Sequence, residues 1–264
     1  LTSQINGLNQ GNRNASDGIA LAQTAESAMD EISSMMQKIR TLAVQANNGT
    51  NTMEDKKALS KEATALATEI NRISKQTTFA GKTILQGYQT NSIVAKPAQN
   101  ANDGDPQAMT LQVGSNKGDT ITFQLGNMMF SKVGEAAKIQ GGGAIGDVIK
   151  DNTSAFGKAA GDAITVNFSV ADAPASIIEH MDKMIGYVDG QRADLGAIQN
   201  RLESSIRNQS NVAANEADAR SRIRDADFAE ESANLSQQSI IQQAAASMLM
   251  QANTRPQLGL SLLG

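Results

Sequence analysis

Three features of this sequence have residue types that could do chemistry. The single histidine, His180, could bind a metal ion or transfer a proton. The segment NANDGD at residues 100–105 carries several oxygen-bearing side chains, which are the ligands that Ca²⁺ prefers. Three consecutive glycines at residues 141–143 could let the backbone approach a phosphate group.

None of these features has the spacing that its chemistry requires. A single histidine excludes an H-E-x-x-H zinc motif, and His180 precedes the apolar position Met181, which favours a partly buried structural histidine. In residues 100–105 the glycine is out of step with an EF-hand loop and no closing glutamate follows, so a turn is the simpler interpretation. The glycines at 141–143 lack the following Lys and Ser or Thr of a phosphate-binding loop and are typical of a linker. We therefore predict no catalytic residue, no cofactor and no metal site.

Composition narrows the class of protein further. The 264 residues carry a formal net charge of -4 and no strongly basic segment, so nucleic acid is not expected as a partner. No apolar run reaches the roughly 18 residues of a membrane-spanning helix, so no membrane insertion is expected. The chain has no cysteine and no tryptophan, and a core of aliphatic residues and methionine suits long helices packed side by side.

A helical pattern at residues 22–46 organises the rest of the chain. Its apolar residues repeat with the alternating three- and four-residue spacing of a coiled-coil seam. A second apolar row beside the seam widens the stripe, so more than one partner helix is required. The seam residues are Ala22, Ala25, Met29, Ile32, Met36, Ile39, Ala43 and Ala46.

Two later segments repeat this spacing. Residues 54–76 follow after a short connection, which predicts an antiparallel helical hairpin, and Asn51 with Glu54 resembles a capping box at its start. Residues 177–206 must meet the first helix to complete the bundle. The glycine-rich residues 1–18 predict a weak helix that is followed by a turn. The seam of the third helix consists of Ile177, Met181, Met184, Val188, Leu195, Ile198 and Leu202.

The apolar period changes from helical to alternating in the middle of the chain. Residues 109–113 and 121–125 alternate apolar and polar side chains around a turn, which predicts a two-stranded hairpin. A third strand is predicted at residues 164–170. We expect residues 88–107 to be surface loop, and residues 126–161 to be loop with a short helix near 145–150. The predicted fold is mainly α, a long antiparallel helical bundle or coiled coil with a small β region between the N- and C-terminal helices.

Residues 225–264 form a helical stripe that a monomer would leave exposed. The polar face of this stripe is Gln, Ser and Asn, with almost no charge after Glu231. Arg255 and Pro256 are expected to end the helix, and an apolar tail follows. Such a surface predicts burial by other copies of the chain or by other proteins. Its apolar residues include Leu235, Ile241, Ala245, Met248, Leu262 and Leu263.

The chain strongly resembles bacterial flagellin. On the N-terminal side the resemblance rests on LTSQINGLNQGNRNASDGIALAQTAESAMDEI, QKIRTLAVQA and EINRISKQTTFAG. On the C-terminal side it rests on VDGQRADLGAIQNRLESSI, SRIRDADFAEESANLS and IIQQAAASMLMQANTRPQLGLSLLG. The central region is only loosely similar, apart from LQVGSNKGDTITFQLGNM, which looks like the hairpin of the family's core domain.

The resemblance implies a secreted structural protein that polymerises into the extracellular flagellar filament used in motility. In the family both termini pair as an inner coiled coil. Leu1 matches a position well inside the family's pattern, so we expect an N-terminally truncated chain whose last helix lacks its partner and is covered by another molecule. The implied partners are other copies of the chain, an export chaperone, and the filament cap and junction proteins. The implied divisions are N-terminal core helices (1–89), a short variable lobe with the β-hairpin region (90–172), a C-terminal core helix (173–225) and an inner coiled-coil segment (226–264).

The resemblance also implies a contact patch on the first two helices. In flagellins this region meets the next subunit and is recognised by the vertebrate Toll-like receptor that senses flagellin. Lys38 stands where the best receptor ligands have arginine, and Thr41 where they have glutamate, so self-packing is expected to be kept better than receptor recognition. The patch residues are Lys38, Arg40, Leu42, Gln45 and Glu62.

Two alternative functions remain open. A hook-filament junction protein shares the terminal patterns, although the DADFAEESANLS and SLLG blocks fit flagellin better. The other alternative is a flagellin-like cell-surface protein that binds a polysaccharide. The low share of aromatic residues disfavours it, because sugar sites usually stack on exposed rings. An enzyme is the least favoured class, since no nucleophile, base or pocket can be named.

Overall fold

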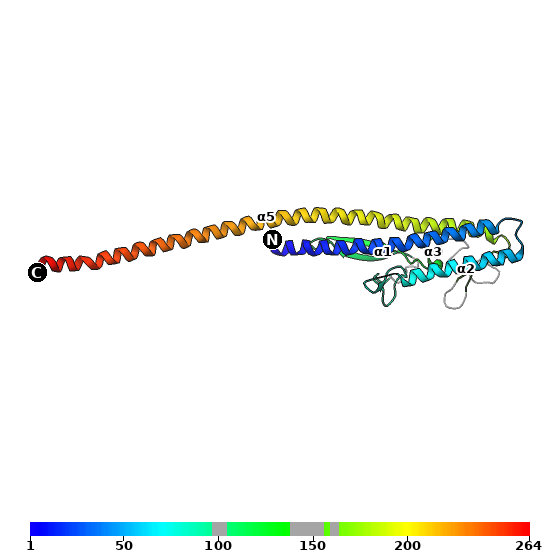
Figure 1. Cartoon of the computed structure of the whole chain (residues 1–264), viewed down its shortest axis with the longest axis horizontal. Coiled ribbons are helices and arrows are strands. Elements are labelled where there is room, and N and C mark those ends of the chain that lie inside the picture. The colour runs from blue at the N-terminus through cyan, green and yellow to red at the C-terminus, as the bar shows by residue number, and fades with distance from the viewer. Residues whose placement is uncertain (97–104, 138–155, 159–163) are drawn as a thin grey trace. The chain divides into compact units, whose positions relative to one another are not determined.

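The computed structural model describes residues 1–96, 105–137, 156–158 and 164–264. Its long helices are α1 (Thr2–Ala46), α2 (Met53–Gln76) and α5 (Ala173–Leu263) (Figure 1). Contacts divide the chain into two units, one of Gly7–Ser210 and one of Leu1–Asn6 with Asn211–Gly264. The predicted fold class, mainly α with a small β region between the N- and C-terminal helices, is confirmed.

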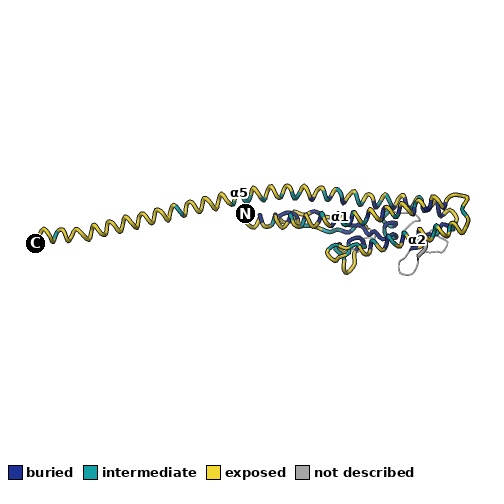
Figure 2. The backbone as a smooth tube through the Cα atoms, viewed as in Figure 1, coloured by how far each residue is buried: buried dark blue, intermediate teal, exposed yellow. Residues whose placement is uncertain are grey.

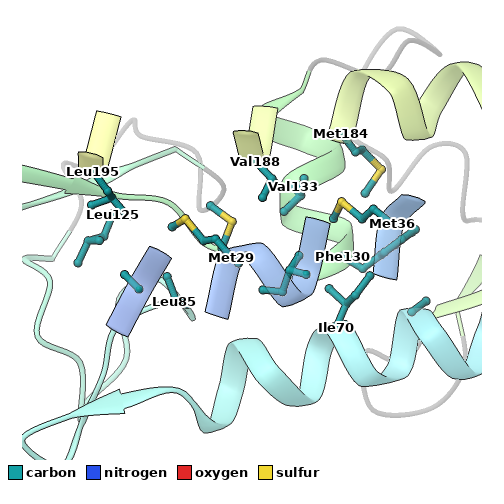
Figure 3. Packing of buried hydrophobic residues seen from close by; sticks show 14 of the residues in the cluster. Met29, Met36, Ile70, Leu85, Leu125, Phe130, Val133, Met184, Val188 and Leu195 are labelled. Carbon is teal, nitrogen blue, oxygen red and sulfur yellow. The ribbon is translucent and has the colours of Figure 1, made fainter. Parts of the chain in front are cut away.

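The seams of α1 and α5 form the core of the larger unit. The predicted seam residues of both helices are no more than 8% exposed. Met29 and Met36 of α1, Ile70 of α2 and Met184 of α5 belong to one hydrophobic cluster (Figure 3). Burial of apolar surface contributes about 25 cal/mol per Å², so this cluster is the main force that holds the three helices together. The helical periodicity therefore predicted the core correctly.

The start of α2 is capped one residue later than the sequence predicted. The Thr52 hydroxyl accepts a hydrogen bond from the Asp55 backbone N–H at 3.1 Å, and the Asp55 carboxylate accepts one from the Thr52 N–H at 2.9 Å. The hydrogen bond from the Thr52 backbone N–H to the carboxylate lowers the pKa of Asp55, and the Thr52 side chain acts in the same direction. The predicted pair, Asn51 and Glu54, is wrong because Asn51 instead donates to the carbonyls of Gln45 and Asn48 and closes the end of α1.

The predicted hairpin is present as β3 (Gln107–Gln112) and β4 (Thr120–Leu125). The strands are antiparallel, in a register that pairs Gln107 with Leu125 and Gln112 with Thr120. In β4 the apolar side chains Ile121, Phe123 and Leu125 are buried and the polar ones between them are exposed, as the alternation predicted. The hairpin therefore has one apolar face that packs into the core.

The predicted turn before the first seam is wrong, because α1 runs from Thr2 through residue 18 without a break. The glycines there lie where β3 and the turn after it approach the helix. A Cβ atom at Gly11 would collide with the Val113 carbonyl, and one at Gly18 with the Leu111 side chain. Asn14 also donates to the Gln112 carbonyl at 2.9 Å. These glycines allow close packing and do not end the helix.

The remaining strands are short and form separate pairs. β1 (Thr78–Phe79) pairs with β2 (Lys82–Thr83), and β5 (Phe156–Lys158) pairs with β6 (Ile164–Val166), both antiparallel. The third predicted strand therefore ends at Val166, short of residue 170. Side chains of α2 bond the backbone of this segment. The Thr64 hydroxyl accepts a hydrogen bond from the Val166 N–H and donates one to the Val166 carbonyl. The Ser60 hydroxyl accepts one from the Phe168 N–H.

A short helix that the sequence did not predict, α3 (Phe130–Ala136), lies in the core. The Phe130 ring is fully buried, and its backbone N–H donates to the side-chain oxygen of Asn71 on α2 at 2.8 Å. Val94 is also buried, so part of the predicted surface loop at residues 88–107 packs inside. The helix predicted near residues 145–150 lies outside the described residues.

Helix α5 continues through the predicted stop at Arg255 and Pro256. A proline removes the one hydrogen bond that its own N–H would donate to the carbonyl four residues earlier. The helix nevertheless continues to Leu263, and the leucines that follow the proline favour helix. Pro256 therefore lies within α5, and the apolar tail is its last turns.

Candidate functional site

The contact patch implied by the resemblance has an exposed part on α1 and α2. Lys38 and Gln45 are exposed on α1, and Glu62 is exposed on α2. Lys38 and Gln45 are seven residues apart, so they lie on the same side of the helix, about two turns from each other. These three side chains are free to meet another molecule. Their role as a contact remains a prediction.

The other two patch residues face the chain itself. The Arg40 guanidinium donates from its Nε atom to the Asp182 carboxylate on α5, at 2.6 Å between Nε and Oδ1. Leu42 is only 8% exposed and belongs to the hydrophobic core cluster. The structure therefore does not gather the five predicted residues on one exposed surface. Arg40 and Leu42 instead tie the helix that carries Lys38 and Gln45 to the bundle.

Polar bonds at regular intervals fix α1 against α5 in an antiparallel arrangement. Ser33 is buried beside the seam, and its hydroxyl donates to the Asp189 carboxylate at 2.9 Å. The same carboxylate also pairs with Arg192. Sequence reasoning missed these bonds, although charged residues that flank two seams are the signal for them. The bonded pairs, in order along α1, are Glu26–Gln199, Asp30–Arg192, Ser33–Asp189 and Arg40–Asp182.

The terminal segment, defined here as residues 211–264, comprises the last part of α5 and the final residue, and most of its residues are exposed (Figure 2). Leu262 and Leu263 are the most exposed of its large apolar residues, at 89% each. No charged residue occurs from residue 232 to residue 254. Exposed apolar surface of this extent marks a site of interaction with another molecule. The predicted residues on it, all exposed, are Leu235, Ile241, Ala245, Met248, Leu262 and Leu263.

Among the described residues, His180 and the other sequence features considered for metal or phosphate binding do not form a site. His180 is half-buried near the start of α5, and burial lowers the pKa of its imidazole, with Lys183 acting in the same direction and Glu179 against it. In the described part of the chain no group of three or more His, Cys, Asp or Glu side chains could hold a metal ion. Residues 100–104 and 141–143 lie outside the described residues. Of the described helices, none has a stretch long and apolar enough to cross a lipid bilayer.

Comparisons with known proteins match both ends of the chain. Residues 1–90 match the bacterial flagellin N-terminal helical region, and residues 178–263 match the bacterial flagellin C-terminal helical region. The flagellin of Bacillus subtilis is 36% identical over 267 residues, which cover 100% of this chain and 83% of that protein.

Solved structures show the same fold. The crystal structure of Bacillus cereus flagellin matches with a TM-score of 0.52 and 24% identity, covering 77% of this chain and 94% of that one. A putative flagellar hook-associated protein from Vibrio parahaemolyticus matches with a TM-score of 0.55 and 17% identity, covering 78% of this chain and 87% of that one. The two family regions and the whole-chain identity to a flagellin, together with the bundle described above, show that this chain belongs to the bacterial flagellin family.

Proposed function

We infer that this chain is a structural subunit that polymerises with copies of itself to form the bacterial flagellar filament used in motility. Membership of the flagellin family supports this function over a junction protein or a polysaccharide-binding protein. The family is structural, so we propose no catalytic role. The corresponding location is the extracellular filament, which the subunit would reach by secretion.

The observation that carries this proposal is the exposed apolar surface of the terminal segment. A helix that presents Ile241, Met248 and Leu249 to solvent, within a stretch that lacks charge, gains stability only when another surface covers it. Isolated helices without packing are marginal, so the same burial would also hold the segment helical. We propose that neighbouring subunits supply this cover in the filament. In the free subunit, an export chaperone would cover the same residues.

The exposed side of α1 and α2 is proposed as a second contact between subunits. Lys38, Gln45 and Glu62 would meet the next subunit, while Arg40 would hold α1 in place through Asp182. The filament cap and junction proteins are proposed as further partners at the filament ends. The vertebrate Toll-like receptor that senses flagellin is proposed as a weaker partner, because Lys38 lacks the planar bidentate group of arginine.

A matched pair of substitutions tests the role of the terminal segment. In a flagellin-deleted bacterium, the gene for this chain would be expressed unchanged, with Ile241→Glu, or with Gln243→Glu. Two residues span about 200° of a helix, so the second variant places the same charge on nearly the opposite side. Filaments seen by electron microscopy should form with the unchanged gene and with Gln243→Glu, and should be lost with Ile241→Glu.

Two results would count against this account. Normal filaments with Ile241→Glu would show that the apolar stripe is not buried on assembly. Antibody label confined to the base of the filament, with another protein forming its length, would instead indicate a junction protein. Export of each variant, followed in the culture medium, separates a failure of assembly from a failure of secretion.

A further inference from the structure

The eleven methionines of this chain fall into groups that differ in exposure. Five have no exposed surface and lie in the core cluster, where Figure 3 shows Met29, Met36 and Met184 packed among aliphatic side chains and Phe130. Two of the exposed methionines are in the terminal segment and one is at the start of α2. The fully buried residues are Met29, Met36, Met128, Met181 and Met184. The exposed ones are Met53 (55%), Met248 (71%) and Met250 (69%).

Exposure decides which thioethers a peroxide can reach. A lone pair on the methionine sulfur attacks one oxygen of hydrogen peroxide, the O–O bond breaks, and an S–O bond forms while water leaves. The sulfur is oxidised to a sulfoxide and the peroxide is reduced to water. The product is polar where the thioether was apolar, and methionine sulfoxide reductases reverse the reaction. Met53, Met248 and Met250 should therefore react before the five buried methionines.

Met248 and Met250 are equally accessible but lie on opposite sides of α5. Met248 follows Ile241 and Ala245 at the spacing of one helical face. Met250 is two residues further, which turns it about 200° away from Met248. The two side chains thus share a helix, a charge-free surrounding and nearly the same exposed fraction. They differ in whether they belong to the apolar stripe.

We propose that Met248 is an oxidation-sensitive modification site that controls assembly. This inference rests on the proposed function, because it requires the stripe to be buried between subunits. A sulfoxide on Met248 brings a strong hydrogen-bond acceptor into that contact. Its neighbours one turn away along the stripe, Ala244, Ala245 and Ala252, have no side-chain hydrogen-bond donor that could pair with it. Burial of an acceptor without a partner disfavours association. Oxidation of the free subunit by peroxide would therefore stop it from joining a filament, and enzymatic reduction would restore it.

The test compares oxidised and untreated subunits made from the complete product of this gene. Wild-type, Met248→Leu and Met250→Leu subunits would be treated with hydrogen peroxide until mass spectrometry of peptides shows the exposed methionines oxidised and the buried ones intact. Polymerisation onto short filament seeds would then be measured by sedimentation. Each variant is compared with its own untreated sample, so any effect of the substitution itself cancels.

We expect that peroxide treatment weakens polymerisation only in subunits that carry Met248. The critical concentration of wild-type and Met250→Leu subunits should rise by about tenfold, the factor expected when a polar group is buried without a partner. Met248→Leu subunits should change little, and methionine sulfoxide reductases should restore the wild type.

Two outcomes would overturn the inference while the proposed function stands. Wild-type subunits with Met248 oxidised could polymerise as well as untreated ones, or treated Met248→Leu subunits could lose as much polymerisation as treated wild type. Failure of untreated wild type to polymerise on its own seeds would overturn the proposed function and this inference with it.

Discussion

Substitution of alanine for Gly190 should raise stability, whereas the same substitution at Gly11 should not. Both glycines lie inside long helices, where alanine is more favourable than glycine by about 1 kcal/mol. A Cβ atom at Gly190 would have no neighbour within 4 Å. Gly190→Ala should therefore raise the free energy of unfolding by close to the full helix gain.

At Gly11, the added Cβ atom would clash with backbone atoms. The new Cβ atom would collide with the Val113 carbonyl, and Val113 is held in place because its N–H donates to the Asp119 carbonyl at 2.8 Å. Overpacking of this kind costs about 1–3 kcal/mol. After the helix gain of about 1 kcal/mol, Gly11→Ala should leave stability unchanged or lower it by up to about 2 kcal/mol. Gly18→Ala should fall between the two variants, because its nearest neighbour is the movable Leu111 side chain.

Thermal unfolding followed by circular dichroism would measure these effects. For a unit of this size, 1 kcal/mol shifts Tm by about 2–4 °C. Gly190→Ala should raise Tm by about that amount, and Gly11→Ala should lower it or leave it unchanged. An equal rise in Tm for both variants would refute the argument that Gly11 is required by the approach of the hairpin.

Three further changes test other parts of the structure. Ser33→Ala removes the hydroxyl that donates to Asp189 and should lower the free energy of unfolding in urea by about 1 kcal/mol; no change would mean that the bond contributes nothing. Asn71→Ala removes the acceptor of the Phe130 N–H bond and should cost about 1–3 kcal/mol, with a loss of the amide-exchange protection of α3. Burial raises the pKa of Tyr187 to about 12, so the folded state holds the phenolic proton more tightly than the unfolded state does. The free energy of unfolding should then fall as pH rises from about 10 to 12. Tyr187→Phe should remove the contribution of this phenol to the pH dependence; the same pH dependence in both proteins would contradict the argument.

The sequence predicted the helices well because burial on one face determines them. The spacing of Met29, Met36 and Met184 identifies a buried seam without knowledge of any partner. Gly11 was misinterpreted because its role depends on Val113, a residue about one hundred positions later that folds back onto α1. The helix α3 was missed because tertiary packing around Phe130 determines it more than helical propensity does.

The candidate site was predicted less well for a related reason. Leu42 falls in the apolar row beside the seam, so the periodicity alone assigns it to the core, and the structure buries it. Its inclusion in the patch came from the family resemblance. Arg40 was named as a contact with another molecule, whereas its partner in this chain, Asp182, could be identified only after the register of α1 against α5 was known. The exposure of the terminal segment followed directly from its apolar stripe and its lack of charge.

The most direct test of the central claim is hydrogen–deuterium exchange of residues 232–254 in free subunits and in filaments made from the product of this gene. In the free subunit these amides lie in a helix without tertiary cover and should exchange rapidly. The account predicts that exchange in this stretch slows at least about tenfold in filaments, because neighbouring subunits cover the stripe. Exchange at the same rate in both states would contradict the claim that the terminal segment is buried when the subunit assembles.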